Sequence, residues 1–305
     1  RCTAGSMWNN YLPNPHFVES FETATGEKFN WDNYLPGYSA MKEKERVVFF
    51  LRDGLSAAEK ERMTAYGADM SKYLDSGNEA RIKKAYESRD PRLQMAVITP
   101  YAQYNGASSG IAHTYTLRWP YRGSDSAEPF DIRTDTNDKF YYLWRKFVPE
   151  GLEQTERDTY GLDIPLIRYA EVLLLKAEAL NEWGSTHESE AIRCVNEVRR
   201  RAGHVELNNA TYPATKVNGQ SDLRERIRNE YYWEIGGEDS MYFHELRWGT
   251  WKDKKFDNNR NGLMQMWGET TYTWYWLGDQ CWSWPIPAKE MEMNSNLEQN
   301  EGWIN

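Results

Sequence analysis

The sequence contains few cysteines and histidines. Its three cysteines, Cys2, Cys194 and Cys281, are an odd number without C-x-x-C spacing, so neither a disulfide framework nor a cysteine zinc site is indicated. The five histidines show no H-E-x-x-H motif and no i,i+4 pair that would place two ligands on one helix face. We therefore predict no metal site and no cofactor.

Long apolar runs and basic tracts are also missing. No stretch approaches the roughly 20 apolar residues of a membrane-spanning helix, and no apolar secretion segment follows Arg1. The net charge is −9 and the Lys and Arg residues are dispersed, which argues against nucleic acid as a partner. The chain does not begin with Met, and RCTAGSMWNN resembles the middle of a sequence, so we expect an N-terminal portion to be missing.

Aromatic residues are abundant. The chain has 14 Trp, 20 Tyr and 10 Phe among 305 residues, and their polar atoms help to explain why a 40% hydrophobic sequence has a mean hydropathy of −0.85. This number of Trp residues is larger than core packing alone usually requires. Because flat rings stack on the apolar faces of sugars, the surplus favours carbohydrate binding.

The strongest periodic pattern predicts a helical hairpin at residues 163–203. We expect Asp163 to cap the first helix, Pro165 to lie in its first turn and Gly184 to end it. A capping box beginning at Ser185 predicts a second helix that ends at Gly203, and the pair has about the length of a tetratricopeptide unit. The apolar faces consist of Leu166, Ala170, Leu173, Ala177 and Leu180, then Ala191, Val195, Val198 and Ala202.

The rest of the chain mixes short helices with loop-rich segments. Gly, Pro and Asn mark the loops, and β-branched and aromatic fragments mark short strands. The expected elements are loops over 1–54, two or three short helices over 56–86, irregular strands and loops over 94–160, a helix over 221–235 and a shorter helix over 238–249.

Six blocks of sequence occur in an order that is more specific than any one block. They are NPHFVESFE (14–22), RDPRL (89–93), PLIRYAEVLLLKAEALNEWG (165–184), VNEVRRRAG (195–203), IRNEYYWEIGGEDSMYFHELRWG (227–249) and WPIPAKEMEMNSNLEQNEGW (284–303). As an ordered set they resemble the SusD/RagB family, the surface lipoproteins that capture nutrients for TonB-dependent transporters in Gram-negative bacteria of the Bacteroidetes type.

This resemblance implies a mostly α fold in which tetratricopeptide-like hairpins pack against an irregular, loop-rich half with short strands. We expect one SusD-like domain with a candidate ligand-binding half at 1–160, a helical-repeat part at 161–250 and a C-terminal part with the closing segment at 251–305. The resemblance also implies a surface-exposed position at the cell outer membrane and a SusC-like TonB-dependent transporter as partner. Membrane attachment would use an N-terminal lipid anchor that is not present in this chain.

A G-x-S-x-G motif at Gly106–Gly110 raises the alternative of a hydrolase. The motif carries chemistry only when a strand precedes it and a helix follows it, so that the serine lies on a strained turn. Since NGASSGIAHT reads as a flexible loop with no alternating strands and helices around it, we predict no catalytic function.

A second motif resembles the start of a calcium loop. Asp257, Asn259, Asn261 and Gly262 have the required spacing, but Gly268 stands where the closing glutamate should be. A solvated turn is therefore the better interpretation.

The candidate ligand-binding residues form two main groups. Trp119, Tyr121 and Arg122 stand beside a proline and a glycine, which places them on or near a loop. Trp274 and Trp276 have period-two spacing, which would place both rings on the same face of a strand. For each ring, packing into the core is the alternative.

Other aromatic residues fall in two classes. Trp31 and Tyr34 form a third candidate ligand-binding group in NWDNYLPGY. Trp183, Trp233 and Trp248 lie in or at the ends of predicted helices, so we expect them in the core.

These observations predict a non-catalytic surface protein that captures a poly- or oligosaccharide and delivers it to a TonB-dependent transporter. A peptide-binding protein of the same family is one alternative, because an acidic, aromatic surface can also hold basic or extended peptides. A helical-repeat adaptor without a small ligand and a glycoside hydrolase are further alternatives, the last requiring two carboxyl groups that face each other.

The closing residues 281–303, CWSWPIPAKEMEMNSNLEQNEGW, predict a structural seal. We expect Trp284 and the two prolines to fix an extended segment. The amide side chains would satisfy backbone groups in tight turns.

Overall fold

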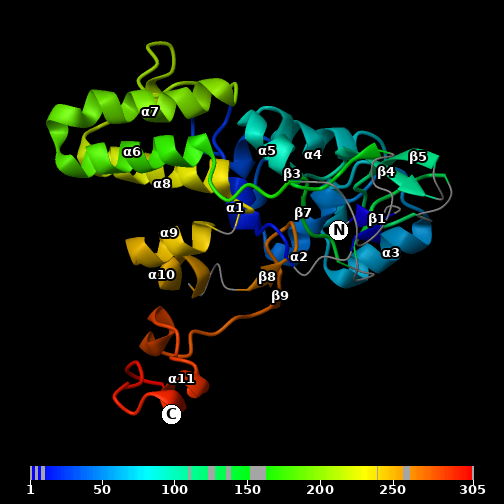
Figure 1. The fold of residues 1–305 in the computed structure, drawn as a ribbon. Coiled ribbons are helices and arrows are strands. Elements are labelled where there is room, and N and C mark those ends of the chain that lie inside the picture. The colour runs from blue at the N-terminus through cyan, green and yellow to red at the C-terminus, as the bar shows by residue number, and fades with distance from the viewer. Residues whose placement is uncertain are drawn as a thin grey trace. The chain divides into compact units, whose positions relative to one another are not determined.

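The computed structural model describes residues 2–3, 6–7, 11–108, 111–122, 128–134, 139–151, 163–238, 240–256 and 262–303. Within these ranges the protein is mostly α-helical with short strands, as predicted (Figure 1). Among the helices that are described, none is both long and apolar enough to cross a membrane.

The helices and strands are short except in the middle of the chain. The α-helices are α1 (Pro15–Ser20), α2 (Glu43–Arg46), α3 (Ala57–Tyr66), α4 (Asn78–Glu87), α5 (Pro91–Ala96), α6 (Tyr169–Trp183), α7 (Glu188–Arg201), α8 (Gln220–Ile235), α9 (Ser240–Trp248), α10 (Trp251–Phe256) and α11 (Ala288–Met293). The strands are β1 (Cys2–Thr3), β2 (Ser6–Met7), β3 (Val97–Ile98), β4 (Gln103–Ser108), β5 (Ile111–Thr116), β6 (Arg133–Thr134), β7 (Leu143–Trp144), β8 (Leu263–Met264) and β9 (Thr270–Tyr272). Turns of 3-10 helix lie at 31–33, 38–40, 47–50, 70–72, 185–187, 213–215 and 279–282.

The chain divides into two compact units. The first unit comprises Arg1–Glu238 and Met264–Glu269, and the second comprises Asp239–Leu263 and Thr270–Asn305. The first holds the helical hairpin, strands β1 to β7 and the large core, whereas β9 lies in the second unit. The subdivision of a single domain at 160 and 250 stays a prediction.

The predicted helical hairpin is present as α6 and α7. Figure 1 shows both lying beside α8, with α6 in the middle. The predicted stripe of α7 is buried, and so are Leu173, Ala177 and Leu180 of α6. Leu223 and Ile227 of α8 are buried as well. This spacing of apolar residues forms helices because it allows each one to bury a single face.

The predicted start of the first helix is wrong. Helix α6 begins at Tyr169, after Arg168 in an extended conformation, and not near Asp163. The Arg168 side chain donates hydrogen bonds to Glu234 (2.8 Å) and Glu238 (3.0 Å) of the segment that ends α8. We attribute the late helix start to these ion pairs, which hold Arg168 outside the helical geometry.

The predicted capping box at Ser185 is also wrong. A 3-10 turn over Ser185–His187 precedes α7, and no side chain caps the first turn of that helix. Gly184, with φ 132°, ends α6 as predicted. The 3-10 turn over Ser185–His187 thus stands where the capping box was predicted.

A continuous apolar face of the first unit is exposed. Leu166, which we expected to be buried in the helix, is 90% exposed. Trp183 is likewise 75% exposed and stacks on the His187 ring with 4.3 Å between centroids, so its predicted core position is wrong. The exposed large apolar residues of this segment are Ile164, Leu166, Ile167, Tyr169, Val172 and Leu175.

The strands form small, separate sheets in the loop-rich part. β4 and β5 make an antiparallel hairpin, with Gln103 opposite Thr116 and Ser108 opposite Ile111. β3 pairs with β7 in the antiparallel sense, and β2 lies between an antiparallel β1 and a parallel β6. The irregular strands predicted for 94–160 are thus confirmed for the described residues.

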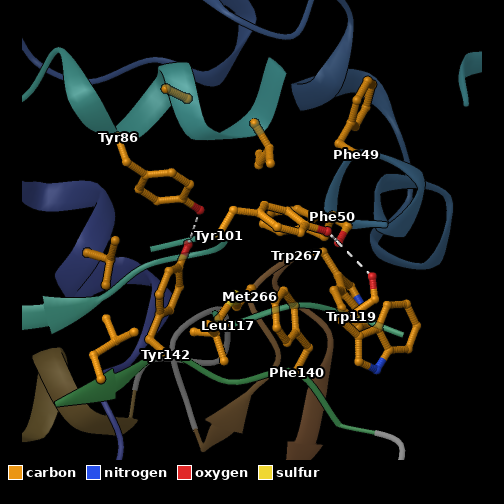
Figure 2. Close-up of a cluster of buried hydrophobic side chains, with 14 of the residues drawn as sticks. Phe49, Phe50, Tyr86, Tyr101, Leu117, Trp119, Phe140, Tyr142, Met266 and Trp267 are labelled. Carbon is orange, nitrogen blue, oxygen red and sulfur yellow. Dashed lines mark hydrogen bonds between the residues drawn. The ribbon is translucent and has the colours of Figure 1, made fainter. Parts of the chain in front are cut away.

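The core of the first unit is rich in aromatic rings, which pack among aliphatic side chains (Figure 2). The Tyr86 and Tyr142 hydroxyls share a hydrogen bond of 2.7 Å. The Tyr101 hydroxyl donates to the Phe50 carbonyl at 2.6 Å. These bonds satisfy phenol groups that would otherwise be costly to bury, so polar-tipped rings serve as core residues.

Six buried ionisable residues connect the helical hairpin with the loop-rich part. Arg92, at the start of α5, donates to Asp90 (2.6 Å) and to Glu230 of α8 (2.6 Å). Arg199 of α7 bonds the other oxygen of Glu230 at 3.3 Å and also pairs with Glu22. We call this group the ionic joint, and its members are Glu22, Asp90, Arg92, Arg199, His204 and Glu230.

The ionic joint lowers the pKa of two carboxyl groups. Burial alone would raise the pKa of Glu22, but hydrogen bonds and charges from His204 and Arg199 outweigh it and lower the pKa below its ordinary value. Burial opposes the ionised form of Asp90 in the same way, and Arg92 more than compensates. Both groups are therefore held as carboxylates in the folded protein.

The closing segment lies in the second unit and confirms the predicted role of its amides. The Gln299 side chain bonds both the backbone N–H (2.7 Å) and the carbonyl (2.9 Å) of Ile286. Asn300 donates to the Trp284 carbonyl at 2.6 Å, and the Trp303 indole donates to the Ser283 carbonyl at 2.8 Å. These side-chain bonds satisfy backbone groups of residues 283–286, which precede α11.

Candidate functional site

Trp119 is a core residue and not a surface platform. Its side chain is 7% exposed, and its ring lies against Phe140 (6.2 Å between centroids) and Trp267 (5.1 Å), as Figure 2 shows. Its carbonyl accepts a hydrogen bond of 2.7 Å from the backbone of Arg52. Because protein covers the ring, the expectation that Trp119 stacks on a ligand is corrected here.

Tyr121 and Arg122 lie closer to the surface than Trp119. The Arg122 guanidinium donates to both oxygens of the buried Asp131, at 3.1 Å each. These hydrogen bonds raise the pKa of Arg122. Arg118 shares the same carboxylate at 2.9 Å, so Arg122 is a fixed, partly exposed donor, and Tyr121 beside it is half-buried.

Trp31 and Tyr34 have different environments. Trp31 is 6% exposed, stacks on Tyr38 at 4.8 Å and donates its indole N–H to Glu19 at 2.7 Å. It is therefore a core residue, which corrects the expectation of a ligand platform. Tyr34 is half-buried, and its hydroxyl bonds Ser88 at 2.6 Å.

Trp274 and Trp276 lie in the second unit, in a segment with an alternating pattern of exposure. β9 ends at Tyr272, so the two rings follow the strand and do not belong to it. Both are half-buried, whereas Tyr275 between them is 74% exposed. Exposure thus alternates along residues 274–276 although they do not belong to a strand.

The two tryptophans are held by neighbouring charges and rings. The Lys255 ammonium of α10 lies 3.9 Å from the centroid of the Trp274 ring. The Trp276 indole donates to Asp279 at 3.1 Å and meets the rings of Phe256 and Trp282 edge-on, at 5.2 and 5.3 Å. We call residues 272–277 with Lys255 and Asp279 the aromatic segment. It combines ring faces with fixed polar groups, which is the chemistry that carbohydrate recognition requires.

Sequence reasoning missed part of this surface. Tyr272, Tyr275 and Trp284 are exposed aromatic residues of the second unit. The Trp284 indole donates to the Tyr242 hydroxyl at 3.1 Å. Tyr272 has the same period-two parity as Trp274 and Trp276, and Tyr275 has the opposite parity, so the same sequence pattern contains both residues. The sequence did not indicate Lys255 as a site residue, because the fold alone brings its ammonium over the Trp274 ring.

The G-x-S-x-G motif does not have the structure of a nucleophile elbow. Gly106 and Ser108 lie in β4, and Ile111 begins the next strand of a hairpin, so no helix follows. The predicted flexible loop is therefore a β-hairpin in its described part, while Gly110 lies outside the described residues. A Cβ at Gly106 would come within 2.8 Å of the Tyr115 ring, which explains the glycine by packing.

The residues 257–261 of the calcium-like motif lie outside the described residues. In the part of the chain that the structure describes, no cluster of three or more His, Cys, Asp or Glu residues is arranged to hold a metal ion. The described residues thus supply no metal centre to the candidate site.

The comparisons with known proteins agree on one family. The SusD family profile matches residues 2–303. A SusD-like protein of Formosa agariphila is 32% identical over 139 residues, which are 45% of this chain and 24% of that protein. The starch-binding protein SusD of Bacteroides thetaiotaomicron is 28% identical over 161 residues, which are 52% of this chain and 25% of that protein.

The solved structures show the same fold over nearly the whole chain. A SusD-like protein of Bacteroides fragilis superposes with a TM-score of 0.60 at 19% identity, covering 97% of this chain and 48% of that one. A SusD-like carbohydrate binding protein of the same species gives a TM-score of 0.50 at 22% identity, covering 94% and 48%. The chain thus spans about half the length of these solved relatives. With its profile match over residues 2–303, the chain belongs to the SusD family.

Proposed function

We propose that this protein binds a glycan at the bacterial cell surface and passes it to a TonB-dependent transporter of the outer membrane. One observation carries the glycan part of the proposal. The aromatic segment presents an exposed Tyr275 between two half-buried indoles whose positions are fixed by Lys255 and Asp279. Such rings offer a sugar broad contact, and the polar groups beside them offer partners for its hydroxyls.

The relatives support the ligand class. One of them is named a starch-binding protein, and one solved neighbour is titled a carbohydrate binding protein. The transporter partner, the outer-membrane location and the absence of catalysis rest on the family resemblance. Tyr34, Tyr121 and Arg122 are proposed as a second set of ligand contacts in the first unit, because their side chains are only partly buried.

The test is binding of polysaccharide by variants of the aromatic segment. Trp274→Ala and Trp276→Ala should each weaken retention in affinity electrophoresis about tenfold, because each removes a ring from the contact surface. Tyr11→Ala is the matched control, since it deletes an exposed aromatic ring of the first unit. Equal retention of all three variants and the parent would remove the aromatic segment from the proposal, and retention of extended peptides instead of polysaccharide would favour the peptide-binding alternative.

A further inference from the structure

Helix α10 contains three lysines, and two of them, Lys252 and Lys255, contact the aromatic segment of an otherwise acidic protein. The sequence of the helix is WKDKKF, and Asp253 is its acidic residue. The Lys252 ammonium pairs with the Asp279 carboxylate at 2.8 Å. Lys255 differs from Lys252, because among the described residues no carboxylate oxygen lies within 4.0 Å of its ammonium. Glu245 contributes an attractive charge from farther away.

The Lys255 ammonium lies near two indoles. Its nitrogen lies 3.9 Å from the Trp274 centroid and 5.6 Å from the Trp251 centroid. The rings attract the cation through their negative faces, but each such contact is worth only about 0.5 to 2 kcal/mol. The rings also remove water from the ammonium, and this burial lowers the pKa of Lys255. The result is a partly desolvated cation that the described residues do not neutralise.

An anionic ligand group near Lys255 would gain more binding free energy than a neutral group. A partly buried ion interacts with an opposite charge more strongly than a fully solvated one, because the effective dielectric is lower. Trp274 is only half-buried, and the Lys255 ammonium lies 3.9 Å from its ring centroid, so a ligand charge at the edge of this ring would lie near the ammonium. A protein of net charge −9 repels polyanions in general. A local cation that no carboxylate of the described residues pairs with is therefore what an anionic ligand needs here.

We propose that the glycan bound at the aromatic segment is anionic, and that Lys255 pairs with one of its carboxylate or sulfate groups. The inference rests on the proposed function and names the substrate class of the same site. Trp274 supplies the ring surface, and Lys255 supplies the charge beside it. Lys252 is already engaged by Asp279 and plays no such part.

The experiment compares polysaccharides that differ only in charge. Polygalacturonate is compared with fully methyl-esterified homogalacturonan, and carrageenan with desulfated carrageenan, in affinity electrophoresis at two salt concentrations. At least one charged polymer should retard the parent protein in the gel. The parent protein should bind the neutral counterpart of that polymer about tenfold more weakly. Higher salt should weaken binding to the charged polymer, because the pair is electrostatic. The polygalacturonate arm reports carboxylate recognition, and the carrageenan arm reports sulfate recognition.

Three variants assign the charge to Lys255. Lys255→Gln should lose about tenfold in binding to the charged polymer and nothing with the neutral one, and Lys255→Arg should restore most of the loss. Lys289→Gln is the matched control, since it deletes an exposed lysine of α11 in the same unit. Circular dichroism melting curves verify that each variant is folded.

Two outcomes overturn the inference in distinguishable ways. If charged and neutral polymers bind equally and Lys255→Gln has no effect, the anionic class is wrong, whereas glycan binding stands. If none of the four polymers and no member of a panel of neutral glycans retards the folded parent protein, the proposed function fails together with the inference.

Discussion

At the scale of single residues, the tryptophans separate into core and surface groups. Trp119 and Trp31 are enclosed by other rings, whereas Trp274 and Trp276 keep part of their surface in solvent. Burial of an aromatic side chain contributes to stability through area and close packing. The two groups should therefore respond differently to the same substitution.

Trp119→Ala should lower the free energy of unfolding by about 3 to 5 kcal/mol, because it empties a large volume beside Phe140 and Trp267. Trp274→Ala should cost only about 1 kcal/mol, because it removes a half-exposed ring and a cation–π contact. Urea denaturation followed by circular dichroism measures both. Equal losses for the two variants would contradict the assignment of Trp119 to the core.

At the scale of secondary-structure elements, α6 has one apolar face inside and another outside. Leu173, Leu174 and Ala177 are buried, while Val172 and Leu175 are exposed on the same helix. Exposed apolar faces of this kind are uncommon on isolated domains and mark contact surfaces.

Leu174→Ala should destabilise the protein by about 2 to 5 kcal/mol, because the Leu174 side chain is fully buried in the hairpin. Leu166→Ala should change stability by less than about 0.5 kcal/mol, because the side chain already lies in solvent. The same denaturation curves give both values. A large loss for Leu166→Ala would show that residue 166 belongs to the buried stripe, as the periodicity had suggested.

The sequence pattern predicted some elements well and others poorly for identifiable reasons. The stripe of α7 and the extent of α8 follow from local spacing, which is why they were predictable. The start of α6 was not, since Arg168 is held by Glu234 and Glu238, which lie far away in the sequence. Local pattern cannot report such long-range contacts.

The candidate site shows the same limit. Trp119 and Trp274 are both flanked by polar and aromatic residues, and local sequence does not separate them. Trp119 is buried because Trp267 and Phe140 fold against it. The period-two spacing of Trp274 and Trp276 was informative, because it needs only an extended backbone.

At the scale of the whole molecule, the ionic joint makes the fold of the first unit sensitive to acid. The folded pKa values of Glu22 and Asp90 lie below their ordinary values of 4.5 and 3.8. A carboxyl group with a lowered folded pKa contributes stability above its unfolded pKa and loses it as pH falls through the folded value. The contribution of these two carboxylates to the free energy of unfolding should therefore be constant near neutral pH. It should decrease when the pH is lowered below about 4.5.

Glu22→Gln tests this origin of the acid sensitivity. The free energy of unfolding of the variant should be about 3 to 5 kcal/mol lower at neutral pH, because Arg199 stays buried without its Glu22 partner. The stability of the variant should also depend less steeply on pH in the acid range. Glu206→Gln is the control, since its pair with Arg200 is exposed, and its unfolding transition should not move. A neutral-pH stability of Glu22→Gln equal to that of the parent would contradict the proposed role of the joint.

The central claim is that this SusD-family protein binds glycan through the aromatic segment. The most direct measurement is affinity electrophoresis of the parent protein and of the double variant Trp274→Ala/Trp276→Ala in gels that contain charged or neutral polysaccharides. The account predicts that at least one polysaccharide retards the parent and that the folded double variant migrates as in a gel without polysaccharide. Retardation of both proteins to the same extent would contradict it.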